Sequence, residues 1–313
     1  MTATAKDSVS ASASGSMRHE PIFLLAPARS YSTVSLALLA GHPDLYGFPE
    51  MLIFTANTVG ELLDQCGPWR HRPILAENRL SGIIRATAEL HDESQESWAT
   101  RNARQWLAER SSWSPVDLMD HLLRLAYPKI GLEKSPDTVA TDEALDACFD
   151  HYPNSRYIHL TRHPVTTMRS AITYWRSVSD DRTGLAAFAA SSWYSGHRRI
   201  LRKLDQLPAG NWLRIKAEDL VTDPATWLPR LLDWLGLPHD DAIVARMTRT
   251  ERWRFAGTGP SGDLLGGDGK FMRSPALRPI PEPTTTAFDP AWGLLDEMCH
   301  RMMALASHLG YRS

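Results

Sequence analysis

The fold is decided by residues 21–50, PIFLLAPARSYSTVSLALLAGHPDLYGFPE. The apolar run at residues 22–26, bounded by prolines, predicts a short buried strand. A hydroxyl-rich turn, PARSYST, follows, and the apolar pattern of STVSLALLA predicts a helix that begins with Ser and Thr. The first N–H groups of a helix lack internal partners and carry the positive end of the helix dipole. A strand, a hydroxylated turn and a helix N-terminus together therefore predict an anion site.

The composition limits the partners of this site. The 313-residue chain has 34 Lys and Arg against 36 Asp and Glu, so no overall basic charge indicates nucleic acid or an anionic membrane surface. No apolar run reaches the length of a membrane span. Cys66, Cys148 and Cys299 are widely spaced, form no metal-binding pattern and fit a reducing compartment. Residues 1–17 are rich in Ser, Ala and Thr without a hydrophobic segment, which predicts a disordered tail on a soluble cytoplasmic protein.

Strand-like and helix-like segments alternate along the rest of the chain, which predicts an α/β fold with a central parallel sheet flanked by helices. Further strands are expected in KIGLEKSP, in RYIHLTRHP and in NWLRIKAEDLV. The expected helices are residues 57–65, residues 80–107 with a break at HDESQES, a helix capped by Ser114, residues 142–151, VTTMRSAITYWRS, GLAAFAASSWYSGHRRILRKL, ATWLPRLLDWLGL, and a last helix from Asp289-Pro290 to about Leu309. We expect one P-loop-like domain over residues 18–313, with a helical insertion at 54–113 and a long glycine-rich loop at 249–287.

A second anion site is predicted where the strand in RYIHLTRHP ends. Arg162 stands at that end, and Ser170 follows eight positions later, about two turns into the next helix. An arginine can grip a phosphate with two hydrogen bonds, and a serine adds a hydroxyl donor. Open α/β sheets bind ligands at the carboxyl ends of their strands, where both clusters fall. The first turn has no glycine and is not a Walker A loop, so the two clusters predict a ligand with two separate phosphate groups.

These motifs resemble those of the sulfotransferases that use 3′-phosphoadenosine-5′-phosphosulfate (PAPS). Their 5′-phosphosulfate loop reads PRSGST or PKSGTT, where this chain has PARSYST, and their 3′-phosphate motif is a strand, an Arg and a Ser eight positions on, as in YIHLTRHPVTTMRS. Three further motifs occur in the same order along the chain as in the family: EKSP, RIKAEDLVTDP with LLDWLGL, and GPSGDLLGGDGKFMRSPALRP. The resemblance covers about residues 21–311, is closest to the bacterial and tyrosylprotein-like branches, and implies a PAPS-dependent transferase of bacterial secondary metabolism.

The resemblance also implies roles for individual residues. The cofactor-binding residues would be Arg29, Ser30, Tyr31, Ser32 and Thr33 around the 5′ end, Arg162 and Ser170 at the 3′-phosphate, and Lys270, which with its glycines would close over the nucleotide. Tyr31 stands where the family has glycine, so the loop is expected either to be tighter or to turn this side chain toward the acceptor. Ala217 replaces a common tyrosine, which calls one nucleotide contact into question.

Sulfuryl transfer requires a base for the acceptor hydroxyl and a cation for the leaving oxygen. The resemblance implies that Glu50 is the base and that Lys134, together with Arg29, supports the leaving oxygen, without a metal ion. By its residue type alone, Glu50 also fits a solvated carboxylate, and Lys134 a surface lysine at a strand end. His42 and His163 stay open as alternative bases.

Other interpretations remain open at this level. Trp193 and Trp253 fit either the core or a stacking role on adenine. A nucleotide-dependent kinase would use the same cradles for ATP, although no P-loop lysine pattern is present. A non-catalytic protein would bind only 3′-phosphoadenosine-5′-phosphate (PAP), the product that PAPS leaves after transfer. The sequence does not identify the acceptor beyond a hydroxyl on a small molecule or a carrier, nor the oligomeric state.

Overall fold

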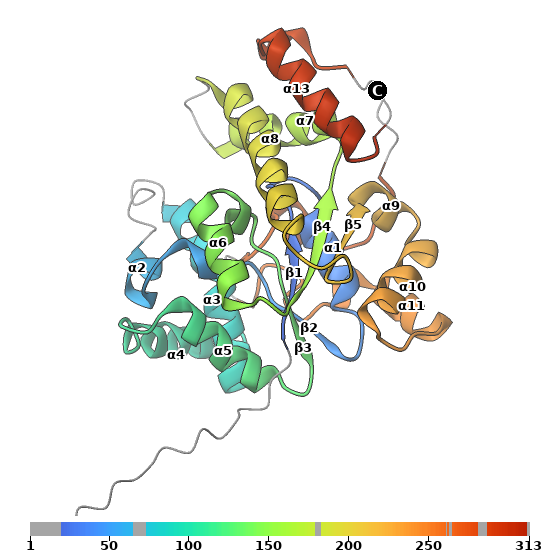
Figure 1. The fold of residues 1–313 in the computed structure, drawn as a ribbon. Helices are drawn as coiled ribbons and strands as arrows, with labels where there is room; N and C mark the ends of the chain where they lie inside the picture. Colours follow the sequence, from blue (N-terminus) through green and yellow to red (C-terminus); the bar gives the residue numbers. More distant parts are fainter. Residues whose placement is uncertain are drawn as a thin grey trace, which may run out of the picture.

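Five parallel strands form the centre of the molecule (Figure 1). The computed structural model describes residues 20–64, 73–178, 183–260, 262, 265–280 and 287–311. The strand order is β2–β3–β1–β4–β5. The strands are β1 (Ile22–Leu25), β2 (Leu45–Gly47), β3 (Ile130–Glu133), β4 (Arg156–Thr161) and β5 (Trp212–Lys216). The predicted α/β fold with a parallel sheet flanked by helices is confirmed.

β1 lies in the middle of the sheet and is buried along its whole length. Ile22 is in register with Leu132 of β3 on one side and with Arg156 of β4 on the other. A continuous apolar run is typical of a strand covered on both faces. Because β3, β1 and β4 are parallel neighbours, the segments that follow them emerge at the same edge of the sheet, and the two predicted anion sites lie there together.

Helices cover the sheet and extend beyond its carboxyl edge. Figure 1 shows α7, α8 and α13 grouped beyond the end of β4, with α10 and α11 beside β5. The helices are α1 (Ser32–Leu39), α2 (Val59–Asp64), α3 (Pro73–Asp92), α4 (Ser97–Ala108), α5 (Pro115–Ala126), α6 (Asp142–His151), α7 (Pro164–Val178), α8 (Leu185–Leu204), α9 (Ala217–Thr222), α10 (Pro224–Leu235), α11 (Asp241–Met247), α12 (Gly269–Arg273) and α13 (Asp296–His308). The predicted insertion at 54–113 contains α2, α3 and α4.

Several helices begin where their capping residues predict. The Ser114 hydroxyl accepts a hydrogen bond from the Asp117 N–H at the start of α5, and Asp223 accepts one from the Thr226 N–H at the start of α10. Such caps satisfy backbone donors that the helix itself leaves unpaired.

Three expectations need correction, and some lie outside the described residues. The short strand β2 was not anticipated. NWLRIKAEDLV is a strand only to Lys216; α9 begins at the next residue, because its first turn carries two acidic side chains that favour a helix N-terminus. Asp289 caps only the 3₁₀ turn η5 (Pro290–Trp292), which ends at Gly293 in a left-handed conformation (φ 62°), and the last helix starts at Asp296. The N-terminal tail and Cys66 lie outside the described residues.

The two tryptophans considered for adenine stacking are core residues. Trp193 is buried and its indole N–H donates to the Arg162 carbonyl at 3.0 Å. Trp253 is buried and donates to the Gly47 carbonyl at 2.8 Å. Both indole rings therefore lie in the core and hold the backbone carbonyls of Arg162 and Gly47. Among the described residues, no helix is long and apolar enough to cross a membrane.

Candidate active site

Residues 27–33, which connect β1 to α1 and include the first two residues of α1 (the first turn), present donors to an anion. Arg29 and Tyr31 have left-handed backbone, with φ of 68° and 57°. This conformation costs a residue other than glycine on the order of 1–2 kcal/mol, so surrounding contacts must hold it. Tyr31 precedes α1 without a side-chain cap, and the buried Ser30 hydroxyl has no hydrogen-bond partner. The N-terminus of α1 and this hydroxyl are suited to an anionic group.

Arg162, directly after β4, holds the first turn through hydrogen bonds to two of its residues. Its Nη1 donates to the Arg29 carbonyl at 2.6 Å, and its Nη2 donates to the Tyr31 hydroxyl at 3.0 Å. Its Nε donates to the Thr166 hydroxyl at 3.2 Å. Burial lowers the pKa of Arg162, an effect that Tyr31 and then Glu218 oppose. The Tyr31 ring faces this guanidinium, at 3.8 Å from the ring centroid.

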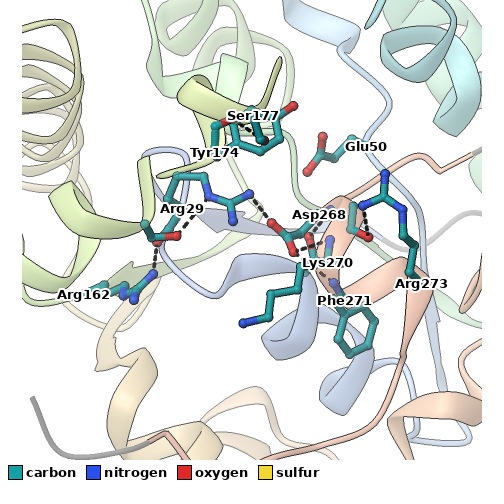
Figure 2. Close-up of polar contacts among 12 residues, drawn as sticks. Arg29, Glu50, Arg162, Tyr174, Ser177, Asp268, Lys270, Phe271 and Arg273 are labelled. Atoms are coloured by element: carbon teal, nitrogen blue, oxygen red, sulfur yellow. Dashed lines mark hydrogen bonds and ion pairs between the residues drawn. The ribbon is translucent and has the colours of Figure 1, made fainter. Parts of the chain in front are cut away.

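Arg29 lies between Arg162 and Asp268 (Figure 2). Its Nε donates to the Ser170 hydroxyl at 3.2 Å, and its Nη1 forms an ion pair with Asp268. The guanidinium lies over the ring of Tyr174, 4.8 Å from the centroid. Ser170 and Tyr174 are four positions apart on α7 and share a face, a spacing that the sequence already contains. Arg29 thus contacts the residue expected at the 3′-phosphate, and sequence reasoning missed both Tyr174 and Asp268.

Asp268 joins the glycine-rich segment to the first turn. Its N–H donates to the Thr33 hydroxyl at 3.0 Å, and its carboxylate caps α12 by accepting from the N–H groups of Lys270 and Phe271 at 3.0 Å. Burial alone would raise the pKa of Asp268, but Arg29 and the Phe271 N–H bring it below its ordinary value. Lys270 contributes its backbone N–H to this cap, and its side chain is exposed.

Glu50, Lys134 and Thr33 form one connected chain of polar groups. Lys134 follows β3 and is 1% exposed, while its amine donates to the Thr33 hydroxyl at 3.0 Å and forms an ion pair with Glu50. Glu50 is 25% exposed and faces the same space as Asp268 (Figure 2). The residues expected to act on the acceptor and on the leaving group are therefore adjacent.

The backbone of Glu50 is held between two glycines. Its N–H donates to the Gly266 carbonyl at 2.9 Å, and a Cβ added to Gly82 of α3 would collide with the Glu50 carbonyl. Gly266 has φ +68° and lies against the backbone of Gly82. Arg85, one turn further along α3, donates to the carbonyls of Gly257 and Leu265 at 3.0 and 2.8 Å. The insertion and the glycine-rich segment thus both contact Glu50.

A buried carboxyl group supports the same segment from β3. The Ser135 hydroxyl accepts from the N–H groups of Met51 and Leu52 at 2.9 and 3.0 Å and donates to Glu133. Burial raises the pKa of Glu133 to about 7, and the hydrogen bond from Ser135 limits the rise. The residues that follow Glu50 are therefore attached to the end of β3.

Comparison with known proteins identifies this arrangement. The sequence profile of the sulfotransferase family matches residues 21–241. The chain belongs to the sulfotransferase family. No match was found among the curated proteins. The sulfotransferase domain of the olefin synthase from Synechococcus PCC 7002 is similar, with 25% identity, a TM-score of 0.69, and coverage of 95% of this chain and 96% of that chain. The sulfotransferase domain from the curacin biosynthetic pathway has the same fold, with 21% identity, a TM-score of 0.70, and coverage of 95% and 99%.

This sulfotransferase uses PAPS as its co-substrate, and its residues fit that donor. A buried Ser30 hydroxyl without a partner lies in the first turn, where an anion would supply the missing acceptor. The Arg162 guanidinium keeps N–H groups beyond those its three hydrogen bonds use. The residues predicted for both cradles lie at the carboxyl edge of the sheet, where Arg162 contacts the first turn.

The two histidines of this sulfotransferase considered as alternative bases both contact backbone groups. His42 is fully buried; its Nε2 lies 2.8 Å from the Pro238 carbonyl, and its Nδ1 accepts from the Asp44 N–H at 3.1 Å. The Nδ1 of His163 accepts from the Val165 N–H at 3.3 Å, its Nε2 is buried without a hydrogen-bond partner, and burial, followed by Arg162, lowers its pKa. Both ring nitrogens of His42 are engaged with backbone, which argues against a role as base.

Beside the altered Ala217 position, a tyrosine comes from the other end of the chain. Ala217 is buried at the start of α9. The hydroxyl of Tyr311 donates to Glu218 at 3.0 Å and lies 3.0 Å from the Thr161 hydroxyl. Glu218 also accepts from the His163 N–H at 2.9 Å. These contacts tie the chain end to the segment that carries Arg162.

Proposed function

We propose that this sulfotransferase transfers the sulfuryl group of PAPS to a hydroxyl of a small-molecule or carrier-bound acceptor, with Glu50 as the general base. The observation that carries the proposal is the polar chain from Glu50 through Lys134 to Thr33. It places a carboxylate, a buried cation and the first turn in contact. A base for the acceptor and a cation for the leaving oxygen are the two requirements of the reaction.

In this proposal Glu50 accepts the proton of the acceptor hydroxyl while the new sulfur–oxygen bond forms and the bond to the donor phosphate breaks. Lys134 remains fixed by the Thr33 hydroxyl and offers positive charge to the oxygen that departs with PAP. Arg29, which forms an ion pair with Asp268, supplies a second positive charge. With these two cations in place, the proposed reaction uses no metal ion.

The proposed donor-binding residues are those that the family motifs imply, and the contacts between the two turns support them. Ser30, Ser32 and Thr33 would hold the 5′ end at the N-terminus of α1, and Arg162 and Ser170 would hold the 3′-phosphate. Lys270, exposed on the α12 turn that Asp268 caps, would close over the nucleotide. Arg29 connects both ends, since it belongs to the first turn and contacts Ser170.

The two similar structures support an acceptor made in bacterial secondary metabolism. One is a domain of an olefin synthase and the other belongs to the curacin biosynthetic pathway. We place the enzyme in the cytoplasm, where PAPS is available and the cysteines remain reduced.

Mass spectrometry tests the proposal directly. The purified enzyme is incubated with PAPS and sets of free and carrier-bound hydroxyl compounds, and products are scanned for an added sulfo group. A thermal shift with PAP that exceeds the shifts with ATP and NAD should accompany the transfer, because a ligand that binds only the native state raises its melting temperature. A shift with ATP and none with PAP would contradict the proposal.

A further inference from the structure

Tyr31 stands at the junction of the two phosphate cradles. Its backbone belongs to the first turn, and its side chain contacts Arg162, which follows β4. The hydroxyl accepts from the Arg162 Nη2 at 3.0 Å, and the guanidinium lies 3.8 Å from the ring centroid. Glu50 lies across the Arg29–Asp268 pair from Arg162 (Figure 2). Tyr31 therefore faces the 3′-phosphate cradle and not the base.

The backbone at this position would suit glycine better than tyrosine. With φ 57° and ψ 19°, Tyr31 is in the left-handed region, where a side chain carries a steric cost. A tyrosine held there must be compensated by its contacts: its ring packs against the hydrophobic core, and its polar contacts are with Arg162. The cost and the contact together indicate a role for the side chain.

We infer that the Tyr31 hydroxyl is a donor-binding group that hydrogen-bonds the 3′-phosphate and sets the preference for 3′-phosphorylated nucleotides. A phenol hydroxyl is both an acceptor and a donor. Its oxygen accepts from Arg162, which leaves its own proton available for another acceptor. A phosphate oxygen held by the remaining N–H groups of Arg162 would be that acceptor, and a hydrogen bond to a charged group is stronger than a neutral one. This inference rests on the proposed function of Arg162.

Comparison of two nucleotides separates this role from a purely structural one. PAP and adenosine 5′-phosphate differ only in the 3′-phosphate, so the ratio of their dissociation constants reports on the 3′ cradle alone. Tyr31→Phe keeps the ring beneath Arg162 and removes only the hydroxyl. We expect this variant to bind PAP about tenfold to a hundredfold more weakly, while its affinity for adenosine 5′-phosphate stays within about threefold of wild type.

Tyr194→Phe is the matched control. Tyr194 of α8 also pairs its hydroxyl with an arginine, Arg198, at 3.5 Å, outside the site. Isothermal titration of wild type and both variants gives the two constants for each protein, and thermal unfolding of the free proteins checks that they are folded. The control should retain the wild-type ratio.

The outcomes are distinct. A Tyr31→Phe ratio equal to that of wild type would overturn the inference, and so would an equal loss for both nucleotides, which would show that the hydroxyl acts only through the shape of the turn. A wild-type protein that binds PAP no better than adenosine 5′-phosphate would instead overturn the proposed 3′-phosphate site itself.

Discussion

Glu50 is connected to its surroundings through every part of the residue. Its carboxylate pairs with Lys134, its N–H with Gly266, and its carbonyl lies against Gly82. Such a residue can be changed at the carboxylate without moving the backbone, because the backbone contacts are independent of the side chain.

Glu50→Gln should cut turnover by about two to four orders of magnitude with PAP affinity near that of wild type. Glutamine is almost isosteric, but its amide cannot take the acceptor proton. Steady-state kinetics and PAP titration measure the two effects, and Glu109→Gln, a change at an exposed helix end, serves as control. If turnover stayed within a few-fold of wild type, the base would have to be sought elsewhere.

Arg162→Ala should weaken PAP binding by about 2–4 kcal/mol. The buried phosphate would lose its charge-assisted partner, and the first turn would lose the hydrogen bond to the Arg29 carbonyl. Titration calorimetry measures the loss, with the exposed Arg198→Ala as the comparison variant. Equal affinities for the two variants would show that the 3′-phosphate binds at another place.

At the scale of elements, α3 determines where Glu50 lies. Gly82 permits the helix to contact the Glu50 backbone, and Arg85 fastens the helix to two carbonyls of the glycine-rich segment. Burial lowers the pKa of Arg85 to about 10, still far above neutrality, so the charge is retained. The insertion therefore has a part in shaping the site in addition to any contact with the acceptor.

Gly82→Ala should lower kcat much more than it lowers PAP affinity. The added Cβ cannot coexist with the Glu50 carbonyl, so the segment that carries the proposed base must shift, whereas the hydrogen bonds of Arg162 involve neither residue. Overpacking of this kind costs about 1–3 kcal/mol, which thermal unfolding would register. Alanine at Gly210, which has open space around its Cβ position, is the control. Wild-type kcat in the Gly82 variant would show that α3 does not set the position of the base.

The sequence predicted most of the elements because their signals are local. Capping residues such as Ser114 and Asp223 predict where helices begin, and the apolar run of β1 predicts a central strand. β2 was missed because three residues provide too little periodicity. The partners of the predicted site residues could not be derived either. Asp268 reaches Arg29 only through the tertiary path of the glycine-rich segment, which no local spacing encodes.

At the scale of the whole molecule, buried titratable groups oppose one another in their dependence on pH. Burial raises the pKa of Glu133 to about 7. In the unfolded chain the pKa of a glutamate is about 4.3. Between about pH 4.3 and pH 7, Glu133 therefore keeps its proton in the folded protein and has lost it in the unfolded chain. The stability that comes from this proton is complete below about pH 4.5 and is lost as the pH rises to about 7.

From pH 5 to pH 8, the free energy of unfolding of Glu133→Gln should rise relative to that of wild type by up to about 3 kcal/mol, because only wild type loses the stability that comes from the proton. Glutamine keeps an oxygen that can accept from Ser135 but has no proton to lose. Urea unfolding of both proteins at the two pH values measures the change, with Glu109→Gln as the exposed control. A difference in unfolding free energy that is the same at both pH values would contradict the assignment.

The buried pair of His159 and His197 has the opposite effect. Their rings are joined by a 2.9 Å hydrogen bond, and burial lowers the pKa of His197 to about 3 and that of His159 well below its ordinary value. Below about pH 6.5 the unfolded chain binds protons that the folded protein does not. Each histidine therefore lowers the free energy of unfolding by about 1.4 kcal/mol for every pH unit by which the pH falls.

Replacing His197 with leucine should flatten the acid side of the stability curve. The slope of the unfolding free energy between pH 6 and pH 4.5 should decrease by about 1.4 kcal/mol per pH unit relative to wild type. Denaturant titrations at three pH values in this range measure the slope. An unchanged slope would mean that His197 is already charged in the folded protein.

The contact of Glu50 with Gly82 and Gly266 has a consequence for how activity arises during folding. The three residues lie far apart in the chain and meet through backbone atoms. Closing such long loops costs configurational entropy, which is recovered only when the enclosing core has formed. On refolding from denaturant, the helical signal should therefore return before sulfuryl transfer does. A partly folded chain in which these loops are still open would lack both the proposed base and the contacts of Arg162 and Ser170 with the first turn, and so would not transfer a sulfuryl group to unintended acceptors.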